Sequence, residues 1–130
     1  MERAMKNIVF YLGLGTLLTH EMDAMTHHEW RILPLTSWLP DDTGQLVFLL
    51  FHVPLFAVLI SLVASTNEQI RLRTQLGVSI FLIVHGILHA VFMGNSNYEF
   101  SSMTSNALIF GGAALGTFHL LFEYFGKTNR

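Results

Sequence analysis

The stretch QLVFLLFHVPLFAVLISLVA, residues 45–64, decides the fold. It carries no charged residue over twenty positions. A helix rises about 1.5 Å per residue, so twenty residues extend about 30 Å, which is the thickness of the hydrocarbon core of a bilayer. Pro54 lies inside the stretch and is expected to loosen the helix locally. The stretch therefore predicts a transmembrane helix.

Three further apolar stretches resemble the first in length. They cover residues 8–24, 75–93 and 106–125. No small-x-small cleavage site follows residues 8–24, so we expect this segment to be retained as a helix. The chain of 130 residues is 52% hydrophobic and only 12% charged, and this charged fraction is about half that of soluble domains. The sequence predicts an all-α, four-helix transmembrane bundle in a single integral membrane domain, residues 1–130.

The basic residues predict the orientation of the bundle. Six of the seven flank the ends of the spans that lie on one side of the membrane, and only Arg31 falls on the other side. The six are Arg3, Lys6, Arg71, Arg73, Lys127 and Arg130. By the positive-inside rule, both termini should be cytoplasmic (N-in/C-in). We expect a multi-pass protein of the bacterial inner membrane, with the lipid bilayer as its main partner.

The segment between the first two spans is expected to lie along the outer membrane surface. Pro34 and Pro40 prevent it from forming one long helix. Trp30 and Trp38 have a spacing typical of an interfacial aromatic belt. We therefore predict an interfacial segment that covers the outer end of the bundle.

Composition excludes several kinds of chemistry. The chain has no cysteine, so it has no disulfide, thiolate metal site or cysteine nucleophile. Its formal net charge is −2, and no basic patch suggests binding to nucleic acid.

Histidines gather at one depth in the predicted bundle. The seven are His20, His27, His28, His52, His85, His89 and His119. His20, His52, His85 and His89 come from three spans, and each lies roughly 6–12 Å below the outer boundary. His27 and His28 lie just above this layer. Ionisable groups inside a bilayer are costly and are candidates for function by default.

The spacing of these residues favours metal binding. His20 and Asp23 share one helix face, and Glu21 and His28 form a second stripe beside it. In HGILH, residues 85–89, two imidazoles stand at i and i+4, where both can hold one metal ion. The predicted ligands are His20, Asp23, His28, His52, His85 and His89. Nitrogen and oxygen donors suit a divalent metal, zinc or iron above all. The carboxylates can instead orient the imidazoles.

Two other features are expected to be structural. His119 lies deeper than the main layer, with Glu123 one turn away, and we predict a His–Glu hydrogen bond there. The glycine pairs Gly112–Gly116 and Gly13–Gly15 are typical of close helix packing.

Residues 20–30, HEMDAMTHHEW, resemble a family of small, uncharacterised bacterial inner-membrane proteins with four spans. The shared pattern is H-x-x-D-A-x-x-x-H-E-W, and the matching residues are His20, Asp23, Ala24, His28, Glu29 and Trp30. The resemblance implies no activity, but it favours His28 over His27 as a functional residue. HGILH is more distantly similar to one histidine box of membrane desaturases and hydroxylases, which hold two irons.

Three functions remain open from the sequence. The first is a metalloenzyme of hydrolase or oxygenase type that acts on a lipid-like substrate near the outer face, with Glu21 or Glu29 as general base. The second is a b-type cytochrome, in which His52 with His85, or His20 with His89, holds haem b while Gly86 lets the macrocycle approach. The third is a metal carrier or an accessory subunit of a larger membrane complex. A homo-oligomer is also compatible with the sequence.

Overall fold

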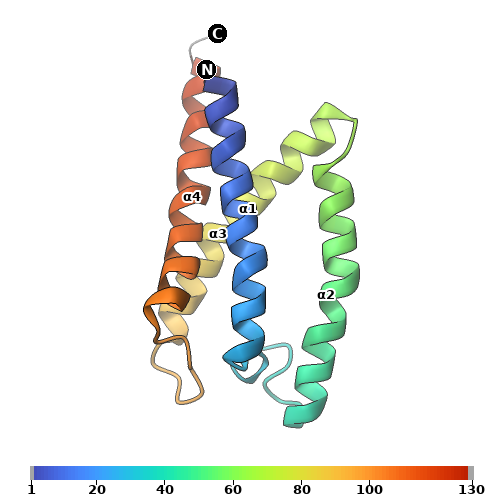
Figure 1. The fold of residues 1–130 in the computed structure, drawn as a ribbon, viewed down its shortest axis with the longest axis vertical. Coiled ribbons are helices and arrows are strands. Elements are labelled where there is room, and N and C mark those ends of the chain that lie inside the picture. Colours follow the sequence, from blue (N-terminus) through green and yellow to red (C-terminus); the bar gives the residue numbers. More distant parts are fainter. Residues whose placement is uncertain (1, 129–130) are drawn as a thin grey trace.

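The computed structural model describes residues 2–128 and confirms the all-α prediction (Figure 1). Four long helices are joined by loops and one short 3₁₀ helix, and no strand occurs within the described residues. The elements are α1 (Glu2–Thr26), η1 (Glu29–Arg31), α2 (Asp41–Val63), α3 (Glu68–Phe92) and α4 (Met103–Thr128). Arg130, one of the basic residues used to predict orientation, lies outside the described residues.

Each predicted span corresponds to one helix, although the spans 45–64 and 75–93 each end one residue beyond their helices, and every helix begins before its span. Asn67 caps α3, because its side chain accepts hydrogen bonds from the backbone N–H groups of Gln69 and Ile70. This cap starts α3 seven residues before the apolar stretch. Pro40 immediately precedes α2, and the helix continues through Pro54. The polar residues at these ends are therefore helical although they lie outside the apolar segments.

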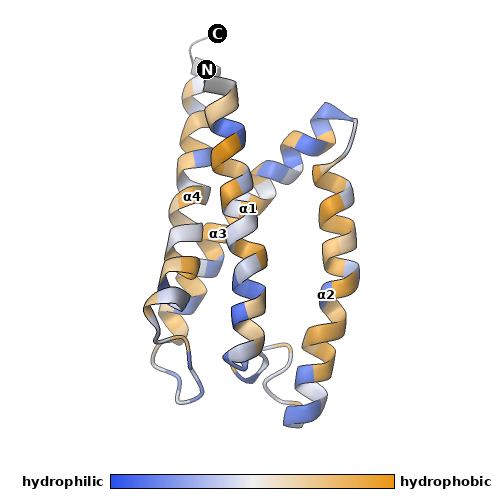
Figure 2. Ribbon diagram, viewed as in Figure 1, coloured by the Kyte–Doolittle hydropathy of each residue, from blue (hydrophilic) through white to orange (hydrophobic). Residues whose placement is uncertain are grey.

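Three of the four helices are long and apolar enough to cross a membrane: α2, α3 and α4. The helix α1 has 25 residues, which is sufficient length, but it is not among the three. Lys6 near its start, and Glu21 and Asp23 near its end, reduce its apolar character. In Figure 2 the C-terminal part of α1 is a hydrophilic patch in a mostly apolar molecule. The chain thus has the helices of a membrane protein.

The helices α1, α3 and α4 pack together, whereas α2 stands apart from them along most of its length (Figure 1). Only 11% of the apolar stretch of α2 is buried, compared with 39% for α3. The start of α1, the end of α4 and the α2–α3 loop lie at one end of the molecule (Figure 1). The α1–α2 and α3–α4 connections lie at the other end, which we call the outer end.

Glycines allow α4 to approach its neighbours closely. A Cβ atom added at Gly116 would lie 2.6 Å from the backbone oxygen of Ser79, and one at Gly112 would lie 3.2 Å from Leu82. This confirms the packing role predicted for that pair. Gly13 also faces Leu82, at 3.1 Å, but a Cβ at Gly15 would meet nothing within 4 Å. The packing prediction is therefore wrong for Gly15, which faces open space.

The two tryptophans of the α1–α2 connection have different environments. Trp38 is 74% exposed, as expected of an interfacial residue, whereas Trp30 is only 2% exposed. The Trp30 ring packs on Gly44, where a Cβ atom would lie 3.0 Å from it. Its indole N–H donates a hydrogen bond to Asp41. Trp30 is thus a core residue that joins η1 to α2, and its assignment to an interfacial belt is wrong.

Candidate metal centre

Four side chains from three elements meet near the outer end of the three-helix unit, which is formed by α1, α3 and α4. His20 comes from α1, His85 and His89 come from α3, and Glu29 comes from η1. One ligand atom of each lies within 4.8 Å of those of the other three. All four side chains are at most 9% exposed. We call this group the His₃Glu cluster.

A tight turn brings Glu29 back into the bundle. The helix α1 ends at Thr26, and His28 then adopts a left-handed conformation with φ 53° and ψ 45°. A non-glycine residue in this region costs about 1–3 kcal/mol and persists only where its surroundings impose it. The turn reverses the chain, so Glu29 and Trp30 point inward from η1. A strained backbone position thus supplies the only carboxylate of the cluster.

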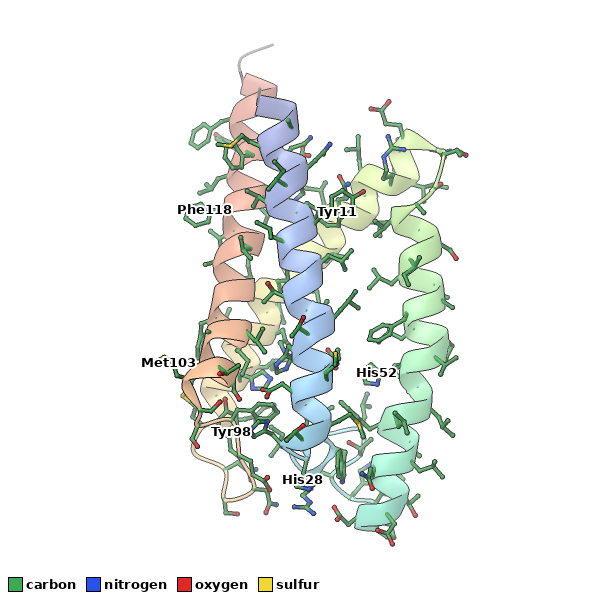
Figure 3. The ribbon with its side chains drawn as sticks, viewed as in Figure 1. Tyr11, His28, His52, Tyr98, Met103 and Phe118 are labelled. Carbon is green, nitrogen blue, oxygen red and sulfur yellow. The ribbon has the colours of Figure 1, made fainter. Side chains whose placement is uncertain are left out.

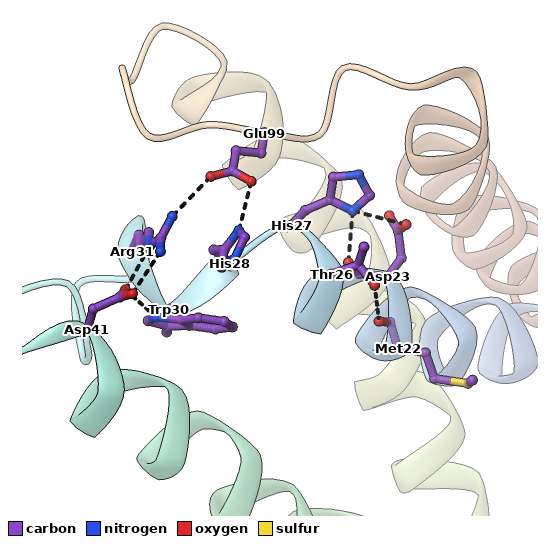
Figure 4. Close-up of polar contacts among 9 residues, drawn as sticks. All are labelled: Met22, Asp23, Thr26, His27, His28, Trp30, Arg31, Asp41 and Glu99. Atoms are coloured by element: carbon purple, nitrogen blue, oxygen red, sulfur yellow. Dashed lines mark hydrogen bonds and ion pairs between the residues drawn. The ribbon is translucent and has the colours of Figure 1, made fainter.

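Ion pairs on the outer surface hold this turn in place (Figure 4). Arg31 contacts Asp41 of α2 at 2.7 Å and Glu99 of the α3–α4 loop at 3.3 Å. His28 shares Glu99, with Nδ1 at 2.8 Å from Oε2. The hydrogen bond with His28, together with Arg31, keeps the pKa of Glu99 below its usual range. The position of Glu29 therefore depends on contacts with both α2 and the α3–α4 loop.

The distances within the cluster are close to those of a metal site. Glu29 Oε2 lies 3.4 Å from His20 Nε2, and Glu29 Oε1 lies 3.6 Å from His89 Nε2. In a tetrahedral zinc site, with metal–ligand distances near 2.0–2.1 Å, neighbouring ligand atoms are about 3.3 Å apart. The three imidazole rings lie edge to face, with centroids separated by 4.6–5.0 Å. Small adjustments of the side chains would therefore bring all four donors around one ion.

The donor atoms of the cluster lack hydrogen-bond partners among the described residues. The buried atoms are both ring nitrogens of His20, Nε2 of His85, Nε2 of His89 and Oε2 of Glu29. Burial opposes ionisation of Glu29, but its contacts with His20 and His89 prevail and lower its pKa to about 2. Glu29 is thus an anion beside the imidazoles of His20 and His89. Buried polar atoms without partners are costly, and a cation at the centre would satisfy one nitrogen of each ring together with Glu29.

Aromatic side chains surround and orient the cluster. The hydroxyl of Tyr98 lies 3.2 Å from His89 Nδ1, so it fixes the ring and leaves Nε2 facing the cluster. Phe100 is buried and packs against both His20 and His89. Both aromatic residues lie in the α3–α4 connection, and Figure 3 shows Tyr98 at this end of the molecule. The loop therefore closes the cluster from water.

The structure does not bring His28, Asp23 and His52 into the cluster. His28 pairs with Glu99, and Asp23 contacts Nδ1 of His27 at 3.1 Å. His52 lies on the side of α2 that faces α1 (Figure 3). Its Nδ1 contacts the backbone oxygen of Phe48 at 2.6 Å and its Nε2 contacts Glu21 at 2.9 Å. Both ring nitrogens of His52 are thus engaged by neighbouring oxygens and not by the cluster.

His119 forms a separate polar group nearer the other end of the bundle. Its Nδ1 is hydrogen-bonded to the hydroxyl of Ser79 at 2.8 Å. Glu123 is 3.9 Å from His119 Nε2 but only 2.6 Å from the ammonium of Lys6. The predicted His–Glu hydrogen bond is therefore replaced by a Ser–His bond and a Lys–Glu ion pair. Buried apolar residues lie between this group and the His₃Glu cluster, among them Leu17 and Leu82.

The sequence predicts Glu29 as a possible general base and as a residue of the shared pattern, but not as a metal ligand. It lies in a loop beyond the first span, so helical spacing could not place it beside His20. The signal was the shared pattern itself, in which Glu29 and Trp30 follow His28 directly. Both residues turn inward, as the left-handed His28 allows.

The chain belongs to a family described as Family of unknown function (DUF6713), whose model matches residues 6–125. This agrees with the resemblance to an uncharacterised family. Comparison with curated proteins and with solved structures gives no match.

Proposed function

We propose that this protein is a membrane-embedded metal-binding protein that holds one divalent cation, zinc or iron, between His20, Glu29, His85 and His89. One observation carries the proposal: three buried imidazoles and one buried carboxylate converge with their donor atoms unpaired within the described residues. Three nitrogens and one oxygen suit both metals. When bound, the ion would act as a Lewis acid, and it would lower the pKa of a water only at a further position beyond the four protein donors.

The contacts of the cluster favour a metal ion over haem. An axial pair must leave room for a macrocycle between the two rings, but His20 and His89 are in edge-to-face contact with centroids 5.0 Å apart. Gly86, which would let the macrocycle approach, instead faces α4, where an added Cβ would lie 2.9 Å from Ala113. His52 is engaged by Glu21 and Phe48. Neither proposed axial pair therefore fits.

The position of the cluster also disfavours a carrier. A carried ion needs ligands along its whole path, but buried apolar side chains, including Phe10, Leu17 and Leu82, separate the cluster from the His119 group. The ion would accordingly stay in place, as a structural or catalytic centre does.

A metalloenzyme acting on a lipid-like substrate is the more specific form of the proposal. The sparse packing of α2 supports it, because only 11% of its apolar stretch is buried, which leaves most of this helix to contact lipid. Glu21 lies outside the His₃Glu cluster, and its contact with His52 holds it as a candidate general base. Hydrolysis and oxygenation are both compatible with this arrangement.

We further propose that α1 is a fourth span, with both termini in the cytoplasm of a bacterial inner membrane. The start of α1 and the end of α4 lie at the same end of the molecule (Figure 1). Lys6, Arg71 and Arg73 lie at that end, as the positive-inside rule requires of the cytoplasmic side. The His₃Glu cluster then lies near the outer face.

Metal analysis of the purified protein tests the proposal. Protein expressed in medium with added zinc and iron should contain about one ion per chain by mass spectrometry of the elements. Its absorption spectrum should show no Soret band. His119→Ala is the matched control, because it removes a buried histidine outside the cluster. A metal-free protein under these conditions, or a Soret band, would contradict the assignment.

A further inference from the structure

A pocket lies between α1 and α3 at the end opposite the metal centre. Its volume is about 290 Å³, near the lower end of the range of about 300–1,000 Å³ seen for small-molecule sites. Lys6, Asn7 and Tyr11 of α1 form one wall, and Arg71 and Gln75 of α3 form the other. Figure 3 shows Tyr11 on the side of α1 where α3 passes. The two helices thus diverge around a space lined by polar groups.

The pocket presents cations and hydrogen-bond donors together. Lys6 and Arg71 stand on opposite walls, and both are already oriented: Lys6 by Glu123 at 2.6 Å, and Arg71 by the backbone oxygen of Ser65 at 2.9 Å. The guanidinium has five N–H donors, and Ser65 engages only one of its nitrogens. Glu68 also lines the pocket and Glu123 contacts Lys6, so two carboxylates accompany the two cations.

Gln75 adds an amide group to the α3 wall of the pocket. The residue is only 4% exposed, so its position is set by packing. Its amide N–H groups can donate hydrogen bonds to a polar group bound in the pocket.

We propose that this pocket binds a phosphate group, carried either by an anionic phospholipid headgroup or by a soluble phosphate. Arg and Lys with amide and hydroxyl donors form the usual set for phosphate oxygens. The pocket opens where the first turns of α3 are hydrophilic (Figure 2), which is the depth of the headgroups. Basic pockets between helices on the cytoplasmic side recognise such headgroups. This site is independent of the metal centre.

Lipid binding by the whole protein in neutral detergent tests the proposal. Native mass spectrometry should show phosphatidylglycerol bound in preference to phosphatidylcholine. Arg71→Gln should weaken this binding about tenfold or more, because it removes a charged phosphate contact. The matched control is Arg73→Gln, which removes the same charge from an exposed position outside the pocket lining. Lys6→Gln tests the opposite wall.

The same variants distinguish the two sources of phosphate. Competition by inorganic phosphate that depends on Arg71 would identify the phosphate group itself as the ligand. Binding of phosphatidylglycerol without such competition would identify the lipid headgroup. Equal binding of both lipids without phosphate binding, or equal losses in Arg71→Gln and Arg73→Gln, would overturn the proposal. Unchanged metal content in Arg71→Gln would show that the variant folds, so the two proposals can fail separately.

Discussion

Glu29 Oε1 lies 3.6 Å from His89 Nε2, although one residue follows the first helix and the other lies in the last turn of the third. The contact joins η1 to α3 and completes a set of donors that neither segment has alone. It also places an anion among three imidazoles, with very little exposure of any of the four.

Glu29→Gln should weaken metal binding at least tenfold. The substitution keeps the size of the side chain but removes the only charge among the donors, and loss of even an outer-shell partner typically costs about 10–100-fold in affinity. Competition with a chelator of known affinity measures the effect. Asp42→Asn is the control, since that carboxylate is exposed at the start of α2 and lies outside the cluster. Equal affinities of Glu29→Gln and the unmodified protein would exclude Glu29 as a ligand.

His85→Ala and His89→Ala should each remove the bound metal, whereas His119→Ala and His52→Ala should retain it. The first two lose a donor of the cluster, while His119 is bonded to Ser79 and His52 to Glu21. Elemental analysis of the four purified variants decides. Full metal content in both α3 variants would rule out the His₃Glu cluster as the site.

Tyr98→Phe should lower metal affinity about 10–100-fold without abolishing binding. The hydroxyl of Tyr98 orients His89 through Nδ1 at 3.2 Å, and outer-shell partners of this kind typically contribute that much. The comparison is chelator competition against Tyr124→Phe, a tyrosine at the other end of the molecule. An affinity equal to that of Tyr124→Phe would mean that the ring of His89 is held by packing alone.

Metal should raise the thermal stability of the protein in detergent. A ligand that binds only the folded state stabilises it by about 2.7 kcal/mol at one hundred times its Kd. The metal-free protein should therefore unfold at a lower temperature, and addition of zinc or iron should restore the higher unfolding temperature. His20→Ala should show no such response. A shift of the same size in His20→Ala would indicate binding elsewhere.

Gly116→Ala should destabilise the bundle by about 1–3 kcal/mol, the usual range for overpacking. The added methyl would lie 2.6 Å from the backbone oxygen of Ser79 and would push α4 away from α3. Gly111→Ala is the matched control on the same helix, because its methyl meets nothing within 4 Å, and alanine favours helix. Thermal unfolding of both variants gives the comparison. Equal stability of Gly116→Ala and Gly111→Ala would mean that α4 can move away from α3 without a loss of stability.

The sequence predicted the helices well because apolar length is a local property. Residues 45–64 define their helix without reference to the rest of the chain. It also predicted the convergence of His20, His85 and His89, because their depths follow from counting residues along helices. Depth alone could not exclude His52, which lies in the same layer but on the helix that stands apart. Depth does not reveal which helices pack together.

Glu29 shows the other limit of sequence reasoning. The position of Glu29 depends on the backbone conformation of His28 and on two ion pairs, His28 with Glu99 and Arg31 with Asp41. These contacts join segments that are distant in the chain, and no periodicity encodes them. The same turn explains why Trp30 is buried although its spacing from Trp38 suggested an interfacial pair.

The separation of α2 from the other helices has a consequence for biosynthesis. The chain emerges from the ribosome in the order α1, α2, α3, α4, but α2 is not part of the three-helix unit. His20 and Glu29 are therefore synthesised before His85 and His89, with the whole of α2 between the two pairs. A nascent chain that stops before α3 carries only half of the donors. Under the proposed function, loading of the ion would follow translation of the third helix.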